Sequence, residues 1–195
     1  GADSHRHGTW PARRSLSSSA SRAKRHTGAR ASAQTLGVMD DPIRISYSLV
    51  GTGWSECIVE TPDARAELSA SYLSDALGKL VLSALSVASG FHAVEFGFDE
   101  EPGEYRWSVE SVDNNAVRLR IFEFQELWGN KPTESGRLML EVAATPLAYA
   151  KAVRSCAEAV LQEYGLTGYA EKWAEHPFPA QALELLGNVI ARWEQ

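Results

Sequence analysis

The sequence predicts an α+β domain of two layers, in which helices pack on one face of a mainly antiparallel sheet of about six strands. Three observations lead to this prediction. Short stretches of alternating apolar and polar residues follow one another between residues 91 and 144. A long apolar stripe at helical spacing precedes them, and further stripes follow. Two earlier alternating stretches complete the expected order β-β-α-β-β-β-β-α-α.

The chain after residue 42 begins with a predicted hairpin. The apolar residues of its first strand are Ile43, Ile45, Tyr47 and Leu49, and those of its second strand include Cys57 and Val59. Gly51-Thr52-Gly53 forms the turn between them. This turn does not fit a dinucleotide-binding loop, because the third glycine is absent and a strand follows where a helix N-terminus is needed.

A helix is expected over residues 66–89. Its apolar positions recur every three or four residues and include Leu68, Tyr72, Leu77, Leu80, Val81 and Leu85. Asp63, Ser69 or Ser71 would cap its start, and Gly90 suits the position just after its end. We expect the stripe to cover the sheet, because no apolar run in the chain reaches the roughly 18 residues that a membrane helix needs.

Four strands in series follow. Their apolar faces hold Val94, Phe96 and Phe98, then Tyr105, Trp107 and Val109, then Val117, Leu119 and Ile121, and finally Leu138, Leu140 and Val142. Turns are expected at Pro102-Gly103 and at residues 113–115, with a polar loop over 128–136. Such short connections make neighbouring strands antiparallel.

Phe122 and Phe124 break this alternation, because they fall on the same side of their strand as Arg118 and Arg120. Two explanations stay open. A β-bulge would shift the pleat by one residue, or the strand buries both of its faces.

Helices are expected in the remainder of the chain. Thr145-Pro146 provides an N-cap and a first helical residue, and Gly165 ends the helix. A short helix is expected over 166–173, and Pro179 can open the last one.

Residues 1–38 differ in composition from the rest. They are rich in Ser, Ala, Arg and Gly, and seven Lys or Arg residues against one acid give them a charge of +6. We expect a disordered basic tail. Three origins stay open: sequence upstream of a natural start at Met39, a targeting peptide, or a basic arm that contacts nucleic acid or an acidic partner. The position of Met39 just before the first strand favours the first.

Residues 39–195 form the expected single domain, and they hold 12 basic and 24 acidic residues, a charge of −12. This charge argues against nucleic-acid binding by the domain. Cys57 and Cys156 are expected to be reduced thiols of a cytoplasmic protein, although the sequence does not decide whether they pair. Their spacing fits no zinc or C-x-x-C pattern.

No catalytic, metal-binding or cofactor-binding residue is predicted. The acids Asp99, Glu100, Glu101 and Glu104 lack the spacing of a calcium loop and are read as a solvated turn. His92 and His176 accompany no hydrolase motif. The chain is therefore expected not to be an enzyme.

The favoured function is an intracellular binding protein whose acidic surface recognises another protein. Trp54 and Trp128, both next to predicted turns, are the expected interface residues. An immunity- or antitoxin-like role rests on analogy alone. The alternative is a small-molecule carrier or enzyme with a pocket between the sheet and helix 66–89, which would be lined by Tyr72, Phe96, Phe98, Tyr105 and Trp107. A homodimer formed through strand 117–127 is a further alternative.

Overall fold

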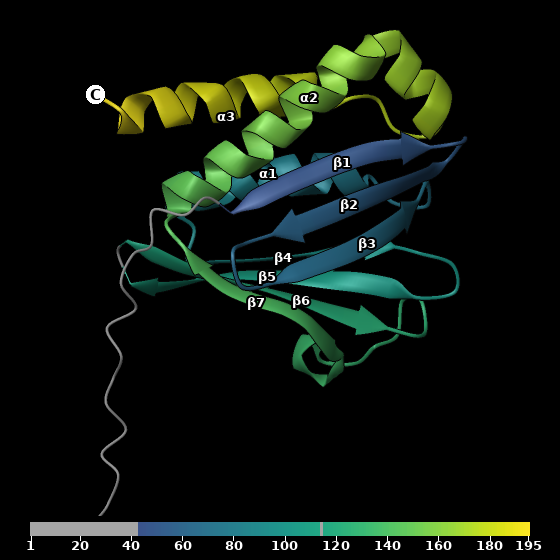
Figure 1. Cartoon of the computed structure of the whole chain (residues 1–195), viewed down its shortest axis with the longest axis horizontal. Helices are drawn as coiled ribbons and strands as arrows, with labels where there is room; N and C mark the ends of the chain where they lie inside the picture. The colour runs from purple at the N-terminus through teal and green to yellow at the C-terminus, as the bar shows by residue number, and fades with distance from the viewer. Residues whose placement is uncertain (1–42, 114) are drawn as a thin grey trace, which may run out of the picture. The chain divides into compact units, whose positions relative to one another are not determined.

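The computed structural model describes residues 43–113 and 115–195. Within them, strands form two antiparallel sheets on which helices pack, so the α+β class is confirmed (Figure 1). The predicted tail, 1–38, and Asn114 of the predicted turn lie outside the described residues. In chain order the elements are β1 (Arg44–Val50), β2 (Trp54–Glu60), β3 (Arg65–Ser71), α1 (Ala76–Ala88), β4 (Ala93–Asp99), β5 (Glu104–Asp113), β6 (Ala116–Phe124), the 3-10 helix η1 (Thr133–Ser135), β7 (Arg137–Ala144), α2 (Pro146–Trp173) and α3 (Ala180–Trp193).

The described strands number seven and form two sheets, where one sheet of about six was expected. Sheet A has the order β1-β2-β3, and sheet B has the order β4-β5-β6-β7. Every pair is antiparallel, as the short turns require. The sheets are separate because α1 carries the chain from β3 to β4, and β3 then lies beside β4 and β7 without forming a ladder with either.

The expected helix over 66–89 is wrong in its first part. Residues 65–71 form β3, and α1 begins at Ala76, where the Asp75 side chain accepts a hydrogen bond from the Gly78 N–H at 3.0 Å. The stretch before Asp75 consists largely of Ala and Ser and fits a period of two as well as a helix. The strand forms because it pairs with the open edge of β2 and satisfies the backbone groups of that edge.

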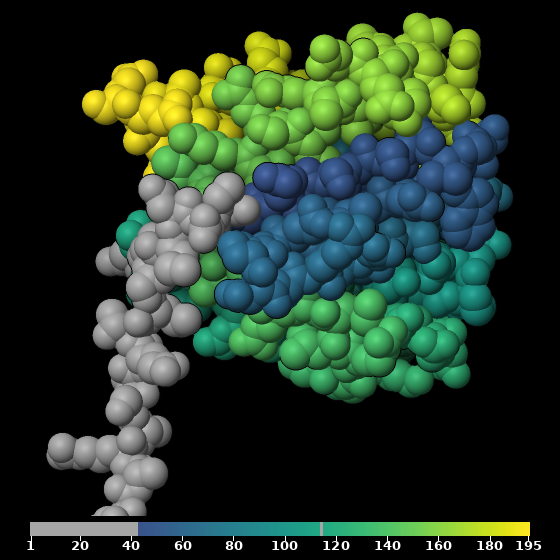
Figure 2. Space-filling view, viewed as in Figure 1, coloured from purple at the N-terminus to yellow at the C-terminus, as the bar shows by residue number. Residues whose placement is uncertain are grey.

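Sheet A has one buried and one exposed face. Along β1 the buried residues Ile45, Tyr47 and Leu49 alternate with exposed or half-buried ones, and β2 and β3 follow the same pattern. The buried face looks toward the helices, and the other face forms the molecular surface in front (Figure 2). The predicted alternation in this hairpin is therefore confirmed.

The helices pack against both sheets and against one another. α2 packs on β1, while α1 packs on β4, α2 and α3. α2 starts with the expected Thr145 cap and bends at Gly165, which has a φ of 63°. Beyond the bend, the Lys172 carbonyl accepts from the Gly53 N–H at 2.7 Å, so the end of α2 holds the β1–β2 turn. None of the helices in the described residues is long and apolar enough to cross a membrane.

Phe122 and Phe124 are buried on the face of sheet B opposite to Trp107, and β6 keeps its register with β5 throughout this region. The second explanation is therefore correct: the strand buries both faces. The segment 125–136 joins β6 to β7 and includes η1 (Figure 1). It packs against both phenylalanines at Gly136, where an added Cβ would lie within 3 Å of the Phe124 ring and of Phe122. The irregularity lies instead in β7, where Met139 is the extra residue between two paired positions.

Two buried tyrosines allow a matched test of the core. The Tyr149 hydroxyl lies 2.7 Å from Ser83 Oγ, which itself donates to the Leu80 carbonyl, whereas the buried Tyr169 hydroxyl has no partner among the described residues. We expect Tyr149→Phe to lower the free energy of unfolding by about 1 kcal/mol, because it removes a made hydrogen bond. Tyr169→Phe is expected to leave it unchanged or raise it. Urea unfolding of both variants checks this, and the reverse ranking would contradict it.

Cys57 and Cys156 are both free and buried. Burial raises the pKa of both thiols, that of Cys156 to about 12. Because the folded-state pKa is raised, this contribution to stability is present below the ordinary thiol pKa of about 8.5 and is lost as the pH rises toward 12.

We therefore expect the free energy of unfolding to fall between about pH 8.5 and pH 11, and to fall less in Cys156→Ala. Urea unfolding over this pH range measures it, and equal slopes for the two proteins would contradict it. In native protein at pH 8 neither thiol should react with a thiol reagent until urea is added.

Candidate interaction surface

Among the described residues, Trp128 is the most exposed of the large apolar side chains, with 68 % of its surface accessible. It is nevertheless held in place. Its indole N–H donates to Asp99 Oδ2 at 3.0 Å, and Asp99 is itself only 7 % exposed. The backbone of Trp128 has a φ of 54°, a left-handed conformation that costs free energy for a bulky residue. The buried Asp99 carboxylate thus fixes an exposed aromatic ring. The surrounding structure also holds the Trp128 backbone in a conformation that an isolated loop would not favour.

The loop carrying Trp128 is fastened to sheet B by Arg106. The Arg106 guanidinium pairs with Glu104 at 2.5 Å, donates to the Gly129 carbonyl at 2.5 Å and also donates to the Lys131 carbonyl. It lies 4.1 Å above the ring centre of Phe124. Because the Arg106 and Glu104 side chains are only 18 % and 7 % exposed, this charge-assisted network acts with little competition from water.

Three carboxylates also meet beside this loop. Oxygens of Glu95, Glu110 and Glu134 lie within 4.8 Å of one another, a spacing that suits a metal ion. However, Glu110 pairs with Arg120 at 2.6 Å, and Glu95 accepts from Thr133 at 3.3 Å. The guanidinium already supplies positive charge, and the second bond ties η1 to β4. Of the three carboxylates, Glu95 therefore helps to hold the loop, and Glu110 is paired within sheet B.

A second exposed apolar cluster surrounds Trp54. Val50 lies directly opposite Trp54 in the β1–β2 ladder, and the Tyr72 ring covers Gly53, where an added Cβ would come within 2.8 Å of it. The Tyr72 N–H donates to the Gly53 carbonyl at 2.9 Å. The exposed fractions of Trp54, Tyr72 and Leu73 are 37 %, 40 % and 37 %. Sheet A therefore ends in a group of accessible apolar side chains.

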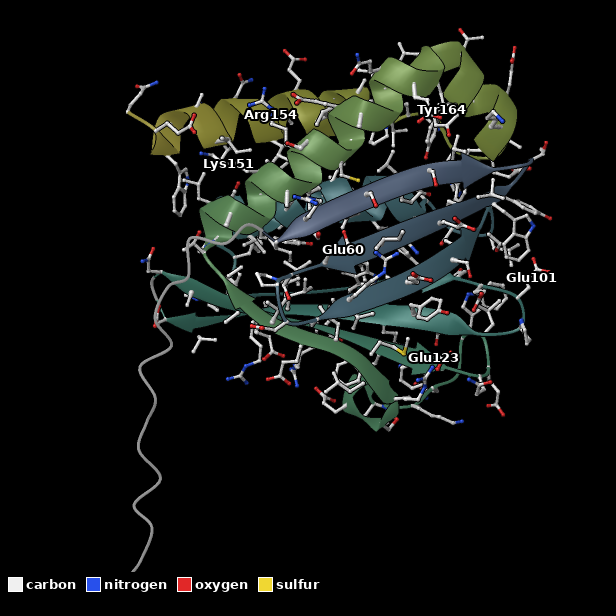
Figure 3. All side chains as sticks on the ribbon, viewed as in Figure 1. Glu60, Glu101, Glu123, Lys151, Arg154 and Tyr164 are labelled. Atoms are coloured by element: carbon white, nitrogen blue, oxygen red, sulfur yellow. The ribbon has the colours of Figure 1, made fainter. Side chains whose placement is uncertain are left out.

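The two clusters lie at the same end of the strands. Ser69 of β3 hydrogen-bonds to Glu100, which directly follows Asp99, the partner of Trp128. Glu101 continues the β4–β5 turn at this end of the molecule (Figure 3). We call this region the tryptophan surface. Its members are Val50, Trp54, Tyr72, Leu73 and Trp128 with the acids Glu56, Glu100 and Glu101.

The structure brings together four of the five residues predicted to line a pocket. The rings of Phe96 and Trp107 stack at 5.3 Å, Phe98 lies 5.2 Å from Trp107, and Tyr105 is opposite Phe98 in the ladder. Burial raises the pKa of Tyr105 above its ordinary value. Tyr72 is not among them, because the chain before it is a strand and directs it to the tryptophan surface. The rings of Phe96, Phe98 and Trp107 pack on one another, and the small-molecule hypothesis stays a prediction.

The strand proposed for self-association is central in sheet B. β6 pairs with β5 on one edge and with β7 on the other. It therefore offers no free edge to a second copy, and any homodimer would have to use another surface.

Sequence reasoning selected two of the three exposed tryptophans in the described residues, Trp54 and Trp128, but missed the residues that hold Trp128. Asp99 was read as part of a solvated turn, although it is buried. The break in alternation at Phe122 and Phe124 was the available signal, because two aromatics on the Arg side require a cover. No family model, no curated protein and no solved structure matches this chain.

A glycine pair tests how closely the loop packs on sheet B. A Cβ at Gly136 would lie 2.6 Å from the Phe124 ring and 2.9 Å from Phe122, whereas one at Gly129 would meet nothing closer than 3.9 Å. We expect Gly136→Ala to cost about 1–3 kcal/mol of stability by overpacking, and Gly129→Ala to cost under about 1 kcal/mol. Thermal unfolding measures both, and equal effects would show that the loop yields easily.

Proposed function

We propose that this protein is a binding protein that recognises a basic partner protein through the tryptophan surface. The observation that carries the proposal is Trp128, a largely exposed ring fixed by a buried carboxylate. Tryptophan contributes strongly to protein interfaces because it buries a large area. A ring that is already immobilised loses less conformational entropy on binding, so its contact contributes more fully to affinity.

The charge of this region supports a basic partner. Residues 43–195 hold 22 acidic and 12 basic residues, a charge of −10. Glu56, Glu100 and Glu101 form no salt bridge with a described residue. Opposite charge on the partner would speed association and disfavour acidic competitors. An immunity- or antitoxin-type inhibitor of a basic protein would suit this chemistry, on analogy of size and charge.

The test begins with capture of partners from the native extract on immobilised full-length protein. The captured protein is then titrated by calorimetry with purified variants. We expect Trp128→Ala to weaken binding about 30-fold or more and Trp54→Ala to weaken it measurably, since interface tryptophans commonly contribute 2 kcal/mol or more. Leu185→Ala, at an exposed position on α3, is the control and should bind as the unmodified protein does.

The salt dependence separates this interface from non-specific adhesion. Affinity should fall with added salt and fall less steeply in Glu100→Gln/Glu101→Gln. A partner held equally well by the Trp54→Ala/Trp128→Ala double variant would overturn the proposal.

A further inference from the structure

A second feature lies at the opposite end of the strands, where β4 begins and α1 ends. A surface pocket of about 400 Å³ opens there between the ends of α1, β5 and α3 and the start of α2. Val87 and Pro146 are its buried floor, and Phe91, Val112 and Trp193 are the accessible apolar residues of its walls. Asp113 lies at its rim. The tryptophan surface contributes none of these residues.

The aromatic side chains of the pocket walls are accessible to solvent, unlike the rings of the core. Phe91 and Trp193 are 63 % and 46 % exposed, yet the indole N–H of Trp193 is anchored to the Ala88 carbonyl at 3.1 Å. The last turn of α1 contains no basic residue. The carbonyls of Ser86, Val87 and Ala88 already accept hydrogen bonds from Phe91, Gly90 and Trp193, so the end of α1 adds only the weak negative potential of its dipole to the pocket.

Asp113 supplies a full negative charge. One of its oxygens accepts from the Asn115 N–H at 2.8 Å, and Asp113 forms no salt bridge with a described residue. Glu194 is close in sequence to Trp193, but it is paired with Lys151 at 2.6 Å. Aromatic walls, an apolar floor, a carboxylate and a helix C-terminus all favour a cation that carries an apolar stem.

We propose that this pocket binds an arginine side chain presented by a polypeptide. Guanidinium groups stack on aromatic rings and pair with carboxylates, and the three-carbon stem covers apolar surface. The volume exceeds that of a bare inorganic cation and suits a whole side chain with its flanking backbone. The site is separate from the tryptophan surface, so either proposal can fail alone.

The test is a titration of the full-length protein with N-acetyl-arginine amide, followed by the NMR signals of the Trp193 indole and the Phe91 and Asp113 backbones. The neutral isostere N-acetyl-citrulline amide is the matched ligand. Titrations of both compounds are run at one fixed pH, because His92 also lines the pocket. We expect saturable shifts at these three residues with the arginine compound and at least about fivefold weaker binding of the citrulline compound.

Two variants then test whether the Asp113 carboxylate and the Trp193 ring contribute to arginine binding. Asp113→Asn, which retains an acceptor for the Asn115 N–H, should weaken arginine binding about threefold or more, and Trp193→Leu should weaken it further. Glu184→Gln, an exposed acid near the start of α3, is the control and should leave binding unchanged.

Equal binding of citrulline, an unchanged affinity in Asp113→Asn, or no saturable shift would overturn the proposal. If free arginine bound tenfold tighter than the blocked compound, the proposal that the arginine belongs to a polypeptide would be wrong. The ligand would then be the amino acid itself.

Discussion

The Arg106–Glu104 pair beneath the 125–136 loop is the interaction on which the rest of sheet B depends. Both side chains are largely withdrawn from water, and the guanidinium binds two loop carbonyls while stacking on Phe124. Removing one member of such a pair leaves an uncompensated charge, which commonly costs about 3–5 kcal/mol. The pair therefore fixes the loop in one arrangement, and that arrangement sets the position of Trp128.

Sheet B consequently differs from sheet A. Its inner face packs on the aromatic core around Trp107, and its outer face is covered by a loop where sheet A meets solvent. The outer face is mixed, with two phenylalanines and several charges side by side, which explains why it needs paired ions and not a helix above it. Polar groups of the covering loop reach partners in the sheet: the Gly129 and Lys131 carbonyls accept from Arg106, and the Thr133 hydroxyl donates to Glu95.

Most of the strands could be predicted from the alternation of apolar and polar residues. A pleated strand with one buried face imposes a period of two on its own residues. β3 escaped detection because its small residues satisfy two periods at once, although only a short turn separates it from its partner β2. The division into two sheets was likewise beyond local patterns, since it depends on how α1 packs. The exposure of Trp54 and Trp128 followed from their turns, but the Asp99 bond did not. The Trp128–Asp99 hydrogen bond joins residues 29 positions apart, and no local pattern around either residue indicates the other as its partner.

The distribution of charge explains why both ends of the strands are suited to cations. Eight of the 12 basic side chains in residues 43–195 form salt bridges within the described structure, several of them along sheet B. These cations are used to hold the fold together, and the acids in excess of them are left at the turns and element ends. The turns at one end carry Glu100 and Glu101, and the turn at the other carries Asp113. Because each of these acids stands beside accessible aromatic rings, the surplus charge lies where a basic side chain would also find apolar surface.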